Sequence, residues 1–214
     1  MDYCEKRGCF FFQNILIYQG LIFTVFAGVK MKDLNELIGT LAVETAKEDK
    51  GLAFKKVIHE IELFYKENFF LDDYEVAIFL TNEEKTVLSF ACPDYLVNSG
   101  MIPVSSTEAF NAAIFRTGRG IIENNLQQQK HLLIFEIIRT PGDKIMPVWK
   151  MIGTLIAVGE DKLGVIEISR RSENMAEAGE DFTESDLMFL ENTIKKLAPF
   201  IQRVMPKNFR GKIT

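Results

Sequence analysis

Two apolar, largely β-branched runs form the strongest strand pattern in the chain. They cover residues 152–158 and 163–169, and the turn-forming residues Gly159-Glu160-Asp161-Lys162 separate them. Two such runs joined by a four-residue polar turn are typical of a β-hairpin. Both runs are apolar on both faces, so we expect other elements to cover each face. The pattern therefore predicts a hairpin at the centre of a sheet.

A long amphipathic helix is predicted after this hairpin. Thr183 and Asp186 have the spacing of a capping box, and Phe182 is placed to pack on Leu187. Apolar residues then recur at spacings of three and four, which is both one face of a helix and a heptad seam. They are Leu187, Leu190, Ile194, Leu197, Ile201 and Val204. Pro199 removes a helical hydrogen bond, so we expect a kink and diverging last turns.

The first part of the chain predicts helices and then a second hairpin. Helical stripes cover residues 31–47 and about 52–68, with a short polar linker between them. His59 falls on the polar face of the second helix, which indicates a solvated side chain. Residues 74–81 and 86–92 then read as strands around the turn 82–85.

The middle of the chain predicts shorter elements. Residues 101–104 fit an edge strand, which tolerates Pro103. Ser105 and Glu108 have capping-box spacing for a helix through Phe115, which Gly118 would close in the left-handed conformation. A strand over 120–124, a helix over 126–138 and a connector over 140–150 follow.

The carboxyl-terminal motifs resemble a known family. A Gly-Val-Ile-Glu-Ile strand, a polar loop and Phe-Thr-Glu-x-Asp opening a long helix resemble the last third of a GAF domain, and the resemblance covers about residues 32–205. It implies an α+β, GAF-like (profilin-like) fold with a six-stranded antiparallel sheet. The N- and C-terminal helices would pack on one face, with a ligand pocket under the connectors on the other. A stand-alone bacterial GAF protein that senses a small molecule is the expectation.

Composition narrows the possible functions. The 214 residues carry a net charge of −5 without a basic cluster, which disfavours nucleic-acid binding. Cys4, Cys9 and Cys92 form no CxxC pair, which fits a reducing, cytoplasmic environment and disfavours a structural zinc site.

The N-terminal residues 1–30 form an apolar extension with three interpretations. Residues 9–29 are uncharged and long enough to cross a bilayer of about 30 Å as a helix, so they could be a membrane anchor. They could also be a leader before a start at Met31, or an extra docked element. The predicted division is therefore 1–30 extension, 31–206 GAF-like domain and 207–214 basic tail.

The motifs of the family's known ligand classes are incomplete in this chain. Cyclic-nucleotide GAF domains resemble it at Phe182 and Asp186, but Arg170-Arg171 stands at their Asn-Lys pair and Leu187 at their final Glu. No cysteine lies beside a histidine in the connector, as bilin attachment requires. Free methionine sulfoxide reductases use several cysteines, whereas the domain here holds Cys92 alone. His131 is the one candidate haem ligand, so no cofactor is assigned.

The expected site is a pocket under the middle connectors, with apolar walls and a few polar groups. Its predicted residues are Ser106, Phe110, Asn124, His131, Phe135, Arg139 and Trp149. We expect a non-catalytic sensor of an unidentified small organic effector, acting as a homodimer through Leu187, Leu190, Ile194, Leu197 and Ile201. The alternatives are a ligand-free dimerisation or protein-interaction module, and a redox enzyme of the free methionine sulfoxide reductase type.

Overall fold

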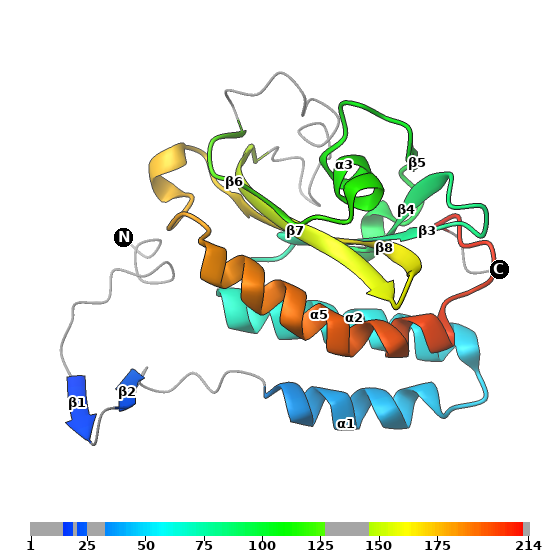
Figure 1. Cartoon of the computed structure of the whole chain (residues 1–214), viewed down its shortest axis with the longest axis horizontal. Coiled ribbons are helices and arrows are strands. Elements are labelled where there is room, and N and C mark those ends of the chain that lie inside the picture. The colour runs from blue at the N-terminus through cyan, green and yellow to red at the C-terminus, as the bar shows by residue number, and fades with distance from the viewer. Residues whose placement is uncertain (1–14, 19–20, 25–32, 127–145, 212–214) are drawn as a thin grey trace.

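A computed structural model describes residues 15–18, 21–24, 33–126 and 146–211 of the chain (Figure 1). Its centre is a six-stranded antiparallel sheet in the order β5-β4-β3-β8-β7-β6. The strands are β3 (Val76–Thr81), β4 (Val87–Cys92), β5 (Met101–Pro103), β6 (Ile121–Glu123), β7 (Val148–Val158) and β8 (Asp161–Arg171). Helices cover one face of the sheet, so the predicted α+β class and six-stranded architecture are confirmed.

The predicted central hairpin is β7 and β8, and both strands are longer than expected. Val158 pairs with Asp161, so the loop contains only Gly159 and Glu160. The expected four-residue turn was therefore wrong. Gly159 has φ 58°, and a two-residue type II′ turn requires a positive φ at this position, which favours glycine. The polar residues Asp161 and Lys162 were read as turn residues, but they start β8 at its exposed end.

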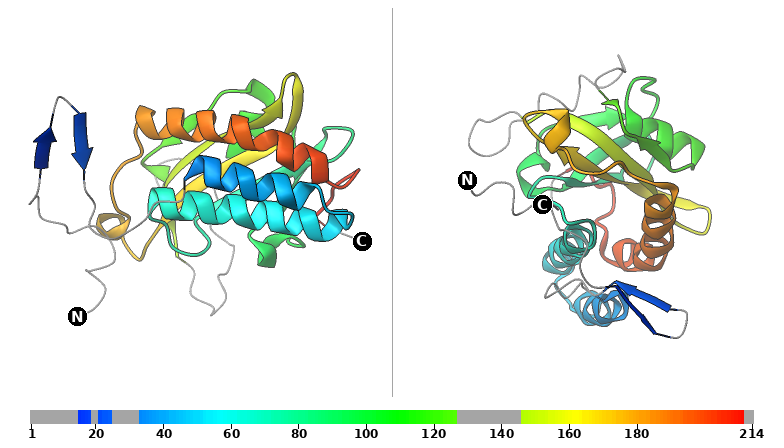
Figure 2. Two further views of the ribbon diagram at one scale, coloured as in Figure 1. Left: turned by 90° about the horizontal axis from the view of Figure 1, so that it is seen from below. Right: turned by 90° about the vertical axis from the view of Figure 1, so that its left-hand side faces the viewer.

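Three helices form the layers on one face of the sheet. α2 (Lys50–Phe69) and α5 (Glu184–Val204) pack directly on the strands, and α1 (Leu34–Thr45) packs on α2 and α5 from the far side (Figures 1 and 2). Leu37 and Leu41 of α1 are fully buried there. Tyr65 of α2 and Thr193 of α5 share a hydrogen bond of 2.9 Å between their hydroxyl oxygens inside this layer. The predicted grouping of the first and last helices on one side is confirmed.

The capping box of α5 is present as predicted. The Thr183 hydroxyl accepts a hydrogen bond from the Asp186 N–H at 3.2 Å, and the Asp186 carboxylate accepts one from the Thr183 N–H at 2.7 Å. The helix continues through Pro199, and Ile201 and Val204 stay buried in the domain. The expected divergence of the last turns was wrong, because their apolar side chains remain in the core.

The heptad seam of α5 is covered within the chain itself. Leu190, Ile194, Leu197 and Ile201 are each at most 2 % exposed, and Leu187 is half-buried. The predicted dimer interface through these residues was therefore wrong, since the sheet and α2 already occupy this face of α5. Dimerisation as such stays a prediction.

The other face of the sheet carries α3 (Phe110–Thr117), the 3₁₀ turn η1 (Asp94–Leu96) and β5. The expected Ser105–Glu108 capping box is wrong, because the helix starts later. Ser106 Oγ instead accepts from the backbone N–H groups of Glu108 and Ala109. Gly118 closes α3 with φ 71°, as predicted. A second 3₁₀ turn, η3 (Met175–Glu177), lies between β8 and α5.

The N-terminal extension is described only at β1 (Ile15–Tyr18) and β2 (Leu21–Thr24), which pair as antiparallel strands. Within the described ranges, no helix is both long and apolar enough to span a bilayer. The predicted helix over 126–138 lies outside the described residues except for Leu126, as does the connector up to residue 145. The division of the chain at residues 30 and 206 stays a prediction.

Candidate functional site

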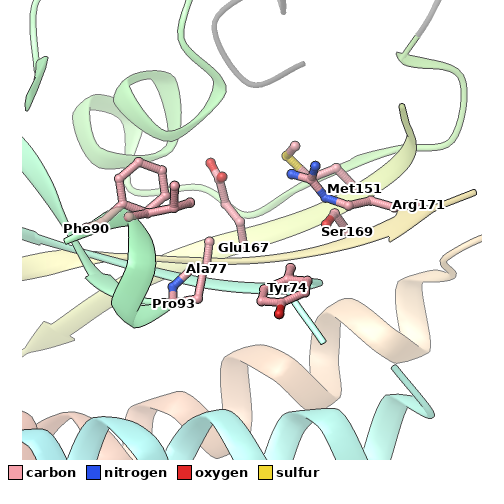
Figure 3. A pocket seen from close by; sticks show the side chains of 9 residues that line it. Tyr74, Ala77, Phe90, Pro93, Met151, Glu167, Ser169 and Arg171 are labelled. Atoms are coloured by element: carbon pink, nitrogen blue, oxygen red, sulfur yellow. The ribbon is translucent and has the colours of Figure 1, made fainter. Parts of the chain in front are cut away.

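A row of polar side chains on β8 faces away from the helices. Glu167, Ser169 and Arg171 occupy alternate positions of the strand, and alternate side chains of a β-strand share one face. Ile166 and Ile168, between them, point into the core under α2 and α5. Figure 3 shows the three polar side chains on one side of the sheet. The pleat of β8 therefore separates a polar row from the helix-side core.

A small cavity lies along this row (Figure 3). Its volume is about 20 Å³, which is room for about one water molecule. Apolar side chains form most of the wall around the polar row, together with one tyrosine. They are Tyr74, Ala77, Phe90, Pro93, Leu96 and Met151. The cavity therefore combines apolar walls with charged groups on one strand.

Glu167 is the most unusual group of the cavity. Its side chain is 3 % exposed, and Oε1 has no hydrogen-bond partner among the described residues. Burial raises its pKa from 4.5 to about 8, against the opposing effect of the Arg171 charge. Gly153 on β7 makes room for it, because a Cβ there would lie 3.2 Å from Glu167 Cγ and 2.8 Å from Ile114 Cδ1 of α3. The carboxyl group is therefore mostly protonated at pH 7 and lacks one hydrogen bond.

Arg171 forms the other end of the polar row. Burial lowers its pKa, while the nearby Tyr95, Glu75 and Glu167 act in the opposite direction. Its backbone N–H donates to Glu75 Oε1 at 2.6 Å, and its guanidinium donates to the Met146 carbonyl at 3.5 Å. The guanidinium is thus a buried cation whose neighbours include two buried carboxyl groups, Glu75 and Glu167.

The neighbouring arginines of β8 do not act together. Arg170 points to the helix side, where its guanidinium carbon lies 4.7 Å from the centre of the Phe182 ring. Arg171 points into the cavity. The pair at the position of the cyclic-nucleotide Asn-Lys motif is therefore divided between the two faces of the sheet.

Two tyrosines stand at the end of the cavity where β3 begins and β4 ends. The rings of Tyr74 and Tyr95 meet edge to face, with their centres 4.9 Å apart and their planes at 89°. Tyr74 has φ 73°, a left-handed conformation that a bulky residue seldom adopts. Burial raises the pKa of Tyr95, and the charge of Arg171 opposes this shift. Tyr74 lines this end of the cavity, and the Tyr95 ring packs against it.

The predicted site residues that the structure describes lie elsewhere. Ser106 binds the backbone before α3, and Phe110 packs against the core on that side of the sheet. Asn124 donates to the Phe182 carbonyl and accepts from the Phe182 N–H, both at 2.9 Å, so it ties β6 to the start of α5. Trp149 Nε1 donates to the Ser172 carbonyl at 3.0 Å. None of these four lines the cavity, and His131, Phe135 and Arg139 lie outside the described residues.

Sequence reasoning missed the polar row, although the sequence held a signal for it. An acid, a hydroxyl and a guanidinium recur at every second position, 167, 169 and 171, and follow the apolar run 163–166 of the same strand. In a central strand covered on both faces, such a pattern indicates polar groups buried on one face.

Cys92 is not placed for thiol chemistry at the cavity. Its side chain is 1 % exposed in the core under the helices, and its Sγ lies 3.7 Å from the Val76 carbonyl oxygen. Burial raises the pKa of the thiol well above its usual value, and a thiolate is the reactive form. His59, on α2, is 61 % exposed, as predicted. No group of three potential metal-binding side chains occurs in the part of the chain that the structure describes.

Comparison with known proteins supports the fold. No protein-family profile and no curated protein matches the sequence. Among solved structures, the GAF domain of an Acinetobacter phosphoenolpyruvate-protein phosphotransferase is 11 % identical with a TM-score of 0.53, over 80 % of this chain and 95 % of that one.

Two further structures are similar at the same level. The GAF domain region of a putative membrane protein from Geobacter sulfurreducens is 18 % identical with a TM-score of 0.50, over 72 % of this chain and 96 % of that one. A free methionine-R-sulfoxide reductase from Neisseria meningitidis, in complex with its substrate, is 14 % identical with a TM-score of 0.50. The match covers 83 % of this chain and 95 % of the reductase chain. At these identities the likeness concerns the fold, and the chain has the fold of a GAF domain.

Proposed function

We propose that this protein is a non-catalytic regulatory domain that binds a small molecule at the cavity in front of Glu167. The observation that carries the proposal is the buried carboxyl oxygen of Glu167, which lines a cavity without a hydrogen-bond partner among the described residues. Leaving a buried polar atom unpaired costs about 1–3 kcal/mol of folding free energy. A ligand that donates a hydrogen bond to this oxygen would recover that cost on binding.

The groups around Glu167 define what such a ligand would present. The ligand would place a donor at Glu167 and could place an acceptor near Ser169 or the Arg171 guanidinium. Phe90 and Met151 would contact its apolar part. A few polar groups in an apolar wall are typical of small-molecule sites.

The small size of the cavity favours a second candidate function. A space of about 20 Å³ admits a water molecule but no organic ligand unless its wall moves. The protein would then be an interaction module whose pocket is filled by its own side chains. The two candidates differ in whether any small molecule raises the stability of the folded protein.

A methionine sulfoxide reductase function is supported by the fold alone. The solved structures that are similar to this chain include free methionine-R-sulfoxide reductases. Cys92, which is the cysteine within the described residues, is buried on the opposite side of the sheet from the cavity. We therefore expect no reduction of methionine sulfoxide.

Native mass spectrometry of the freshly purified full chain tests the proposal. We expect a bound small molecule on the wild type, its loss in Glu167→Leu, which removes the acceptor oxygen, and its retention in Glu160→Gln, which alters the exposed β7–β8 turn. An adduct that survives Glu167→Leu would contradict the assignment of the site. No adduct, together with no rise in melting temperature across a metabolite library, would favour the interaction module.

A further inference from the structure

A second, larger hollow lies on the outside of the same wall. It is an open groove of about 390 Å³ between α2 and the chain segments at residues 73–74 and 93–95. Tyr74 and Pro93 line both this groove and the inner cavity. Tyr95 lines the groove and meets Tyr74 edge to face. The groove and the cavity thus share a partition at Tyr74 and Pro93.

We propose that the groove and the cavity are two halves of one elongated binding site, and that its ligand is a linear organic cation with two or more amino groups. This inference rests on the proposed function, because one end of the ligand occupies the position in front of Glu167. The groove alone falls within the size range of small-ligand sites, about 300–1,000 Å³. The combined site suits a narrow, flexible chain.

The charges of the groove favour a cation. Its lining holds the carboxylates of Glu62, Asp73 and Asp94 against the ammonium of Lys66, with His59 counted as neutral. Lys66 is bound to Asp73 in an ion pair, and His59 Nδ1 lies 3.6 Å from Glu62 Oε2. The groove therefore has an excess of negative charge.

The inner cavity offers a buried acceptor for the other end of such a ligand. Glu75 and Glu167 are both buried and close enough to the guanidinium of Arg171 to influence its pKa. Glu75 is already used, since it accepts from the N–H groups of Arg171 and Asp72. Glu167 Oε1 is the buried acceptor that remains without a partner among the described residues. An ammonium group would supply the missing donor there and would favour the ionised form of the carboxyl group.

The partition between the two halves suits the middle of such a ligand. Tyr74, Tyr95 and Pro93 offer aromatic and apolar surface to methylene groups, and tyrosine rings also attract ammonium groups. The side chains that line both the groove and the cavity belong to the loop residues Tyr74 and Pro93. A ligand chain can pass where these side chains turn aside, and its two ends then meet Glu167 and the carboxylates of the groove.

Isothermal titration calorimetry of the full chain with spermidine and putrescine tests this inference. n-Butylamine is the control with one amino group, and magnesium chloride is the control for non-specific attraction of a divalent cation. Glu167→Gln alters the inner half and Asp94→Asn alters the exposed rim of the groove. Glu160→Gln is the matched control, because it removes one carboxylate from an exposed turn that lines neither half.

We expect spermidine to bind the wild type and to bind at least about tenfold more weakly to both Glu167→Gln and Asp94→Asn. Glu160→Gln should bind like the wild type. Because a bound ammonium favours the ionised carboxylate, binding near pH 7 should also release protons, and this release should disappear in Glu167→Gln. Proton release is measured from the dependence of the binding enthalpy on the buffer.

Any of four results would overturn the inference. Equal binding of magnesium or n-butylamine, or no binding of spermidine at millimolar concentration, would exclude a linear polycation. Sensitivity to Asp94→Asn alone would confine the ligand to the groove. Sensitivity to Glu167→Gln alone would confine it to the cavity, in which case the proposed function would stand and the elongated site would not.

Discussion

Replacing Glu167 by glutamine should change how the stability of the protein depends on pH. The pKa of this carboxyl group is about 8 in the folded protein, against an ordinary value of 4.5. The folded state therefore holds a proton that the unfolded state releases over this range. Since the unfolded state binds fewer protons, the free energy of unfolding falls as pH rises from 4.5 to 8.

The size of the effect follows from the two pKa values. Each pH unit between them costs about 1.4 kcal/mol of stability. Between about pH 5.5 and pH 8 the wild type should thus lose about 3 kcal/mol through this one group. Glu167→Gln cannot ionise and should lose none of it, so the variant should become more stable relative to the wild type as pH rises.

Urea denaturation at a series of pH values measures this difference. The fluorescence of the single tryptophan, Trp149, which is half-buried on β7 and donates to the Ser172 carbonyl, reports unfolding. Glu160→Gln again serves as the control, and its curve should run parallel to that of the wild type. Other titrating groups are common to all three proteins and cancel in the comparison. Parallel curves for the wild type and Glu167→Gln would refute the burial of an uncompensated carboxyl group.

Two further substitutions test the construction of the fold. Thr183→Ala should lower the free energy of unfolding by about 1 kcal/mol, because the Asp186 N–H loses the hydroxyl that caps it. Urea denaturation measures this loss, with Ser185→Ala inside the helix as the control. An equal loss in Ser185→Ala would argue against the capping box. Gly164→Ala should cost about 3 kcal/mol or more, since its Cβ would lie 1.9 Å from the Phe79 carbonyl oxygen of β3. Gly39→Ala in α1, where no atom lies within 4 Å, should instead stabilise by up to about 1 kcal/mol, and similar melting temperatures for the two variants would contradict this account.

Local signals allowed much of the fold to be predicted. Some features depend only on residues close in the sequence, and each of them is found at the predicted position. They are the Thr183–Asp186 capping box of α5, the Gly118 cap of α3 and the edge strand with Pro103. The errors also have local causes. Asp161 and Lys162 are polar enough to read as a turn, yet Lys162 pairs with Ala157 across the hairpin.

The candidate site depends on contacts that no local pattern contains. Glu167 is buried because Ala77 of β3 and Gly153 of β7 flank it in the sheet and because Ile114 of α3 comes close to Gly153. The groups that line the cavity come from β3, β4, β7 and β8 together with the segments before β3 and after β4. Aromatic and histidine residues in the connectors suggested a pocket by composition, but strand register decided which side chains meet.

The short loop of the β7–β8 hairpin also has a consequence for the order in which the protein assembles. Only Gly159 and Glu160 separate the paired strands, so joining them costs little loop entropy. The pairing of β3 with β8, in which Leu80 meets Gly164, must close a far longer stretch of chain. We infer that the hairpin forms early and that β3 docks on it late. Glu167 is then still in contact with water when its strand is built, and it takes up its proton only as β3 and α3 close over it.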